Sequence, residues 1–318
     1  MFEQNVTFGR AVQQEDRKNI SNLILDAYEH SPKFENLIPN TRRRELTVDE
    51  RIFLSDQIED IKKTLSTFGA NTTRFSHGID ISLENIEIYE VPKEKTDLQG
   101  ALFSPEGHIL IMVPSGFDLK NPLLRRLLSH ELSHMTTRSV YMTVYPKGRD
   151  SRIRQSHFGY ERMNYSDETR SSIRSRGLYS EPLAELFSYY DLPDEATEFE
   201  SPYSKSMPFF VSLIKDFAIR SQKSELDVFQ RMYSAFTVRS FTIQKELRDQ
   251  YGTEFMRLLN TIEISTIGEV ANDATFDRML QLGGFRDLYD SISSEINTTG
   301  ITLFNKQQRI TIGEAFFH

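Results

Sequence analysis

The feature that most constrains this chain is residues 129–135, which read Ser-His-Glu-Leu-Ser-His-Met. The segment contains the pattern HExxH, with two histidines four positions apart and a glutamate after the first. In a helix, residues four apart lie one turn apart on the same face, so His130 and His134 can bind one zinc ion together. Glu131 then lies beside them, where it can activate a water molecule. A hydrolytic site of this kind also needs a third protein ligand and an open fourth position.

The flanking sequence predicts a helix around this motif. Asn121 is a favourable N-cap residue, and Pro122 suits the first helical position because its missing N–H is not needed there. Leucines then form an apolar flank that would bury the helix: Leu123, Leu124, Leu127, Leu128 and Leu132. Buried histidines need partners, and a metal is one. The alternative is a chance match on an amphipathic helix with solvated or core histidines.

A strand is expected just before this helix. Residues 107–114 are apolar and rich in β-branched side chains, and they are bounded by glycine and proline. Residues 101–103 and 108–113 flank a turn, which predicts a hairpin. The edge of such a sheet, at residues 108–113, can hold an extended peptide by main-chain pairing while the helix presents the metal. His108 starts the strand, where a surface or turn role is favoured over metal binding.

The third ligand is expected on a second helix that begins near Ser180. Glu181 and Glu185 are four positions apart and share a helix face, where two carboxylates repel unless something positive lies between them. A zinc ion with its histidines would supply that charge, with Glu181 as the ligand and Glu185 orienting a ligand imidazole. The alternative is an exposed acidic face. Asp191 is a weaker candidate ligand because it directly precedes a Leu-Pro turn.

An HExxH helix followed by a Glu-x-x-Ala-Glu helix resembles the gluzincin zinc metallopeptidases, the thermolysin-like class. The separation of the two helices is longer than in thermolysin and closer to that in toxin proteases of the anthrax lethal factor type. The resemblance covers roughly residues 100–190. It implies that His130, His134 and Glu181 bind zinc, that Glu131 is the general base, and that Glu185 supports a ligand.

The residue that stabilises the transition state does not follow from the motif. Gluzincins use a Tyr, His or Arg for this purpose. Tyr179 adjoins the glutamate helix and is one candidate. Arg248 and Tyr251 resemble the Arg-x-x-Tyr pair of the clostridial neurotoxin proteases, although surface residues on a helix are the simpler interpretation. The chain also lacks a glycine soon after His134 and a third histidine at metzincin spacing.

Composition limits the remaining possibilities. The net charge of −8 argues against general nucleic-acid binding, and the absence of cysteine excludes disulfides and thiolate metal sites. No cleavable signal peptide and no membrane-spanning run is apparent. We therefore expect a cytoplasmic protein, or one secreted without a cleavable signal peptide.

Patterning along the chain predicts an α+β fold in three parts. Residues 1–75 form a helical region, with helices over 11–29 and from a capping box at Thr47, and with Arg42, Arg43 and Arg44 as a solvated charge cluster. Residues 76–200 form a zincin-like core with a small mixed sheet, including strands within 79–91. Residues 201–318 form a helical lobe that ends at Gly283 and Gly284, followed by a late hairpin within 301–312. The expected apolar stripe of the second helix is Ile52, Ile58, Ile61, Leu65 and Phe68.

The two expected ligand helices are separated by a long insert. Residues 143–178 contain eight basic and four acidic residues, interleaved with aromatic side chains. Connections of this length tend to be functional or mobile. The insert is either an exosite or flap that favours acidic substrate segments, or a disordered, protease-sensitive segment. His157 lies in it and is most simply a solvated histidine.

Together these features predict a zinc-dependent endopeptidase that acts on a protein or peptide substrate. A bacterial effector or toxin that cleaves a host protein is one version, suggested by the toxin-protease resemblance. Two alternatives remain open: a catalytically silent zincin-fold binding protein, and a zinc amidohydrolase that takes small amides.

Overall fold

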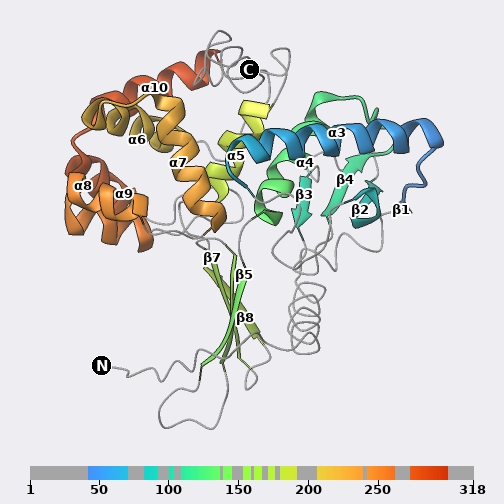
Figure 1. The fold of residues 1–318 in the computed structure, drawn as a ribbon, viewed down its shortest axis with the longest axis horizontal. Helices are drawn as coiled ribbons and strands as arrows, with labels where there is room; N and C mark the ends of the chain where they lie inside the picture. Colours follow the sequence, from blue (N-terminus) through green and yellow to red (C-terminus); the bar gives the residue numbers. More distant parts are fainter. Residues whose placement is uncertain are drawn as a thin grey trace. The chain divides into compact units, whose positions relative to one another are not determined.

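The computed structural model describes residues 42–70, 82–91, 100–103, 109–136, 139–144, 153–158, 161–166, 171–175, 180–191, 206–238, 242–261 and 273–299. The chain divides into two compact units, Met1–Ser175 and Arg176–His318. The first contains two four-stranded sheets with helices, and the described part of the second is helical (Figure 1). The predicted α+β class is therefore confirmed, whereas the boundaries at 75 and 200 stay predictions.

The first sheet has the strand order β1-β2-β4-β3. Strand β2 (Ile86–Val91) runs parallel to β4 (Ile109–Pro114), while β1 (Arg42–Arg43) and β3 (Gly100–Phe103) are antiparallel to their neighbours. Alternate residues of β4, namely Ile109, Ile111 and Val113, are almost completely buried. This period of two is expected when one face of a sheet carries the core. Residues 101–103 and 109–113 of the predicted hairpin lie in β3 and β4, which pair with each other.

Helix α3 (Val48–Thr67) begins with the predicted capping box. The Thr47 hydroxyl accepts a hydrogen bond from the Glu50 amide, and the Glu50 carboxylate accepts one from the Thr47 amide at 2.9 Å. Its buried stripe is Leu54, Ile58, Ile61 and Leu65. The prediction that Ile52 belongs to this stripe is wrong, because its side chain is 57% exposed. Leu54 takes that place in the stripe.

The basic cluster at residues 42–44 is not simply solvated, contrary to expectation. Arg42 and Arg43 form strand β1 beside β2. The Arg44 guanidinium donates to the Phe117 carbonyl at 2.6 Å and pairs with Glu50 and, at 3.5 Å, with Glu90. Arg44 therefore connects the start of α3 to β2 and to the loop between β4 and the next helix.

That next helix, α4 (Pro122–Met135), carries the HExxH motif. The Asn121 side chain accepts a hydrogen bond from the Leu123 amide at 2.9 Å, and Pro122 occupies the first turn, as predicted. The helix packs against β3, β4 and α3. Its fully buried apolar side chains are Leu124, Leu128, Leu132 and Met135. This stripe fixes α4 on the sheet and leaves its other side to the motif.

The insert after α4 contains a second sheet. Strands β5 (Ser139–Val144), β6 (Ile153–Phe158), β7 (Glu161–Ser166) and β8 (Ser171–Ser175) form an antiparallel meander in chain order. Most of the span that the sequence left between exosite and disordered segment is thus regular sheet. The exosite role stays a prediction.

The described part of the second unit consists of six helices. They are α5 (Ser180–Asp191), α6 (Ser206–Ser221), α7 (Glu225–Val238), α8 (Thr242–Thr261), α9 (Asp273–Gly283) and α10 (Arg286–Thr299). Helix α5 packs on α6 and α7, and α6 also contacts α10. The predicted phenylalanine stripes form the core, where Phe209 lies 5.5 Å from Phe276 and 5.7 Å from Phe285 between ring centroids.

Three expectations about elements are wrong. Leu83 lies in a short 3-10 turn (Leu83–Asn85) instead of a strand. Gly284, with φ +72°, does end α9, but the helical unit continues with α10. Strand β4 is paired on both sides, with β2 and β3, so residues 109–113 of the expected substrate edge are not a free sheet edge.

Some predictions fall outside the described residues: the helix over 11–29, the strand residues Ile79 and Ile81, the turn before β4 with His108, and the hairpin within 301–312. Among the helices that the structure describes, none combines the length and apolarity needed to cross a membrane.

Candidate metal centre

Helix α4 places the two motif histidines on one face, as the i, i+4 spacing requires. The Nε2 atoms of His130 and His134 lie 3.2 Å apart, and the rings meet edge to face with centroids 4.9 Å apart. Two ligands of a tetrahedral zinc ion, each about 2.05 Å from the metal, have donor atoms about 3.3 Å apart. The spacing of the two nitrogens therefore fits two ligands of one ion.

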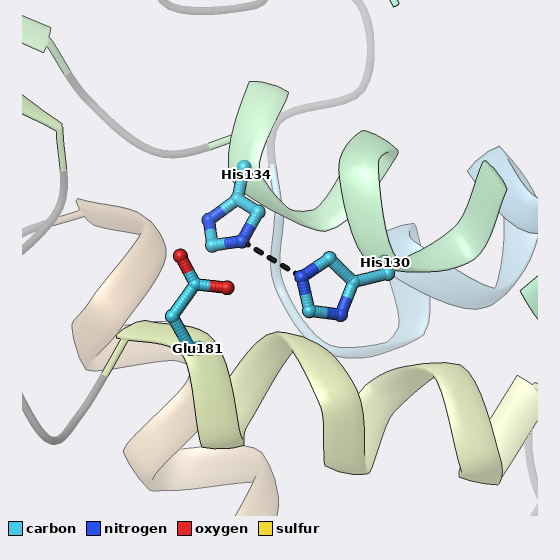
Figure 2. Close-up of side chains that lie close together, drawn as sticks. All are labelled: His130, His134 and Glu181. Carbon is cyan, nitrogen blue, oxygen red and sulfur yellow. Dashed lines mark hydrogen bonds between the residues drawn. The ribbon is translucent and has the colours of Figure 1, made fainter. Parts of the chain in front are cut away.

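Glu181 in the first turn of α5 provides the third donor. One ligand atom from each of His130, His134 and Glu181 can be chosen so that all lie within 4.8 Å of one another. Figure 2 shows the two imidazoles extending from α4 and the Glu181 carboxylate directed toward the ring of His134. The donor set is two nitrogens and one carboxylate oxygen, a combination that zinc binds readily. This group of side chains can hold a metal ion.

These side chains are removed from water. His130 is 8% exposed and Glu181 4% exposed, while His134 is half-buried. Helix α5 is buried on all sides over residues 181–189, so its two glutamates have no solvated face to occupy. Glu185 is 3% exposed, which excludes the alternative of an acidic surface helix. Burying carboxylates is costly unless cations or hydrogen bonds compensate them.

The buried charge is concentrated on these two helices. Among the described residues, the buried Arg, Lys, Asp and Glu side chains are Arg126, Glu131, Glu181 and Glu185, and all four lie on α4 or α5. Arg126, Glu181 and Glu185 each have interaction partners, which can offset part of the cost of burying their charges.

Glu131 is 7% exposed and follows directly after His130 on α4. Within the described part of the chain, no hydrogen bond or ion pair to its carboxylate is found. A buried carboxylate with no competing partner beside two metal-ligand candidates has the properties of a general base.

The other residues considered from the sequence, as a metal ligand or as the stabiliser of the transition state, have different surroundings in the structure. Tyr179 lies outside the described residues. Asp191 is half-buried at the end of α5 and is not part of the ligand group. Arg248 is exposed, whereas Tyr251 is buried and its hydroxyl donates to Asp216 Oδ2 at 2.7 Å. That bond gives Tyr251 a structural role in the helical unit.

Sequence reasoning missed Arg126. The signal was an arginine within a leucine-rich helix, four positions before His130, so that both residues share a face. The side chain is 6% exposed.

Comparison with known proteins identifies no relative of this chain. None of the protein-family models, curated proteins or solved structures searched matches the chain significantly. The resemblance to gluzincins therefore rests on the HExxH motif and the glutamate helix, and it stays a prediction.

Proposed function

We propose that this protein is a zinc-dependent endopeptidase with a zincin-like catalytic core, and that His130, His134 and Glu181 bind the zinc. The observation that carries the proposal is the grouping of two Nε2 atoms 3.2 Å apart with the buried carboxylate of Glu181, together with a second buried acid, Glu131, directly after His130. Three protein ligands are typical of catalytic zinc sites, which keep one position open for water or substrate, whereas structural sites have four.

The proposed reaction is hydrolysis of a peptide bond. Zinc held by these ligands supplies Lewis-acid activation of a water and of the substrate carbonyl. Glu131 accepts the proton that the attacking water loses and then donates it to the leaving amine. The hydrophobic stripe of α4 holds the helix against the sheet, so that His130, His134 and Glu131 keep a fixed relation to one another.

The sheet has a strand edge to which an extended peptide substrate could bind. In the described sheet, β3 is an edge strand with one side unpaired, and α4, which carries the motif, packs against it. A peptide in an extended conformation can add to such an edge through main-chain hydrogen bonds. The substrate edge expected at residues 108–113 thus moves to Gly100–Phe103. This edge favours a peptide over a small amide, and the toxin-like motif spacing is the basis for a host protein as the substrate.

The test is a peptide-library digest with the zinc-loaded protein, compared with a panel of small amides. We expect cleavage of peptides, loss of cleavage with a chelator, and recovery on adding zinc. The Glu131→Gln variant should bind zinc and cleave nothing, because it keeps the shape of the side chain and removes the base. Cleavage of small amides alone would establish the amidohydrolase alternative. A zinc-loaded protein that cleaves neither class would establish the silent binding protein.

A further inference from the structure

The meander β5–β8 is a part of the described chain that the proposed mechanism does not use. Its strands pack extensively on one another, whereas none of the described helices packs on it to a comparable extent. Within the described residues, both faces of this sheet therefore lack a covering layer. The register of the strands shows which residues each face carries.

One face carries alternating tyrosines and arginines. Residues paired across antiparallel strands share a face, and successive residues of a strand belong to opposite faces. Two neighbouring rows on this face are Thr143–Arg154–Tyr165–Ser172 and Tyr141–Ser156–Met163–Arg174. Taking one residue from each strand in chain order gives the Tyr-Arg band, which consists of Tyr141, Arg154, Tyr165 and Arg174.

The opposite face has a different composition. Arg162 lies on it, paired with His157 and Ser175. The other residues of that face are aliphatic or small and polar, among them Val140, Met142, Ile153, Asn164 and Ile173. Arg162 is therefore a matched control for the arginines of the band, because it belongs to the same sheet but to the other face.

The charge of the band suits an acidic partner. The insert that contains the meander has eight basic and four acidic residues, in a chain with a net charge of −8. Glu161 shares the face with the band and leaves it an excess of one positive charge. Guanidinium groups bind carboxylates through paired hydrogen bonds, and tyrosines beside them add apolar contact area and a hydroxyl. Faces rich in aromatic residues and arginine also bind single-stranded nucleic acid, but the acidic chain favours a partner with few charges over a polyanion.

The spacing of the two arginines indicates the spacing of the acids. Arg154 and Arg174 are two strands apart and offset by two residues along the strands. With about 4.8 Å between strands and about 3.4 Å per residue, their backbone positions are about 12 Å apart. Residues four positions apart on one side of an extended peptide are separated by about 14 Å. The band therefore fits a Glu-x-x-x-Glu segment.

The chain keeps the band close to the candidate metal ligands of α4. Tyr141 follows His134 by seven residues, so the two backbone positions lie within about 25 Å of each other. About eight residues of extended peptide cover that distance. One substrate chain is thus long enough to occupy the band and the metal centre together.

We propose that the Tyr-Arg band is an exosite that selects peptide substrates with two acidic residues four positions apart, close to the cleaved bond. The inference rests on the proposed function, because it assigns the substrate class of the same peptidase. Arg154 and Arg174 bind the two carboxylates, and Tyr141 and Tyr165 contact the segment that carries them.

Binding is measured separately from cleavage. The Glu131→Gln protein is titrated into a labelled peptide of about twelve residues with a Glu-x-x-x-Glu segment, and into the same peptide with Gln-x-x-x-Gln, by fluorescence anisotropy. We expect the acidic peptide to bind about tenfold more tightly at low salt, and the preference to disappear at about 0.5 M salt.

The arginine variants locate the contact. In the Glu131→Gln background, Arg154→Gln and Arg174→Gln should each weaken binding of the acidic peptide by about threefold, the size expected for an exposed ion pair. Arg162→Gln removes the same charge from the other face and should change binding by less than about 1.5-fold. Arg154→Glu combined with Arg174→Glu should reverse the preference, so that a Lys-x-x-x-Lys peptide binds more tightly than the acidic one.

Each outcome decides for or against the exosite. Equal binding of the acidic and neutral peptides by the parent protein would overturn it, and so would an equal loss in Arg162→Gln, which would show general attraction to a basic sheet. Tighter binding of a single-stranded oligonucleotide than of the acidic peptide, lost in Arg154→Gln, would overturn it in favour of nucleic acid. Cleavage of peptides by the native protein without regard to acidic residues would refute the exosite and leave the proposed function intact. Selective binding without any cleavage would refute the proposed function and, with it, the assignment of the band as a substrate exosite.

Discussion

Helices α4 and α6 are both largely buried, yet they bury different chemistry. The buried side of α6 is hydrocarbon, apart from two serines: Met207, Phe209, Phe210, Val211, Leu213, Ile214 and Phe217. One of those serines, Ser212, satisfies its hydroxyl within the helix by donating to the Pro208 carbonyl at 2.6 Å. Helix α4 buries a comparable leucine stripe on one side and, on the other, an arginine, a glutamate and a histidine.

The difference shows which helix is shaped by stability alone. Apolar burial in α6 contributes directly to folding, at roughly 25 cal/mol per Å² removed from water. Burial of charge on α4 and α5 opposes folding unless partners or a metal compensate it. Sites that carry such costs tend to be functional, since stability and activity compete for the same positions.

The largest effect is expected for the base. Glu131→Gln should reduce peptide hydrolysis by about 10³-fold, equivalent to about 4 kcal/mol in the transition state. The same change should leave the free energy of unfolding of the metal-free protein unchanged or raise it, because a buried charge is removed. Kinetics and denaturant unfolding of one preparation measure both. A clear loss of stability would mean that the Glu131 carboxylate supports the fold.

A substitution in the hydrocarbon core of α6 should lower stability and leave the metal site intact. Phe209→Ala should lower the free energy of unfolding by about 3–4 kcal/mol, because its ring is fully buried among Phe210, Phe276 and Phe285. Zinc stoichiometry in the folded protein should not change. Urea unfolding and metal analysis test this prediction. Loss of zinc from the folded variant would contradict the account, because it would mean that the apolar packing of α6 also determines metal binding.

The polar contact inside the helical unit has a smaller expected effect. Tyr251 donates to Asp216, which also accepts from Arg220 Nε at 2.6 Å, so Tyr251→Phe leaves the carboxylate with a partner. We expect a loss of about 1–2 kcal/mol in the free energy of unfolding at neutral pH.

The pH dependence of this change has a definite sign. Burial, and then the hydrogen bond to Asp216, raise the pKa of Tyr251 above its ordinary value. A raised pKa in the folded state means that the protonated hydroxyl stabilises the fold below about pH 10 and that this contribution is lost as the pH rises further. The native protein should therefore lose stability more steeply above pH 10 than Tyr251→Phe. Equal slopes in alkaline unfolding would contradict this. Burial also raises the pKa of Tyr289, but equally in both proteins.

The smallest effect is expected at Ile52. Because this side chain is 57% exposed on α3, Ile52→Lys should change the free energy of unfolding by no more than about 0.5 kcal/mol. Its neighbour in the expected stripe, Ile58, is 1% exposed, and Ile58→Ala should cost about 2–4 kcal/mol. Similar losses at both positions, measured by urea unfolding, would mean that the sequence pattern described α3 better than the structure does.

Local signals in the sequence were enough to predict several elements. The capping box at Thr47, the Asn121-Pro122 start of α4 and the β3–β4 hairpin are formed by neighbours in the chain, so their physics is visible in the sequence. The i, i+4 spacing likewise fixed the relation of His130 to His134. Glu181 was predicted from a second helix with two glutamates, and the structure groups it with both histidines.

The features that the sequence did not predict depend on packing between segments that are distant in the chain. Whether Ile52 or Leu54 faces the core depends on how α3 meets α4, and its periodicity allowed both. The pairing of β4 on two sides depends on strand order, which residues 108–113 do not encode. Arg126 looked like one more helical arginine, because only burial separates it from Arg125. The insert after α4 showed charge and aromatic content but no clear alternation, and its meander was not anticipated.

The most direct test is the zinc content of the purified protein by plasma mass spectrometry, with His134→Ala, Glu181→Ala and the control Asp191→Ala. We predict about one zinc ion per native chain, lost in the first two variants and kept in the control, with all proteins folded by circular dichroism. Zinc lost in His134→Ala but kept in Glu181→Ala would remove Glu181 from the site. A native chain that binds no zinc after reconstitution would contradict the account of α4 and α5 as a metal centre.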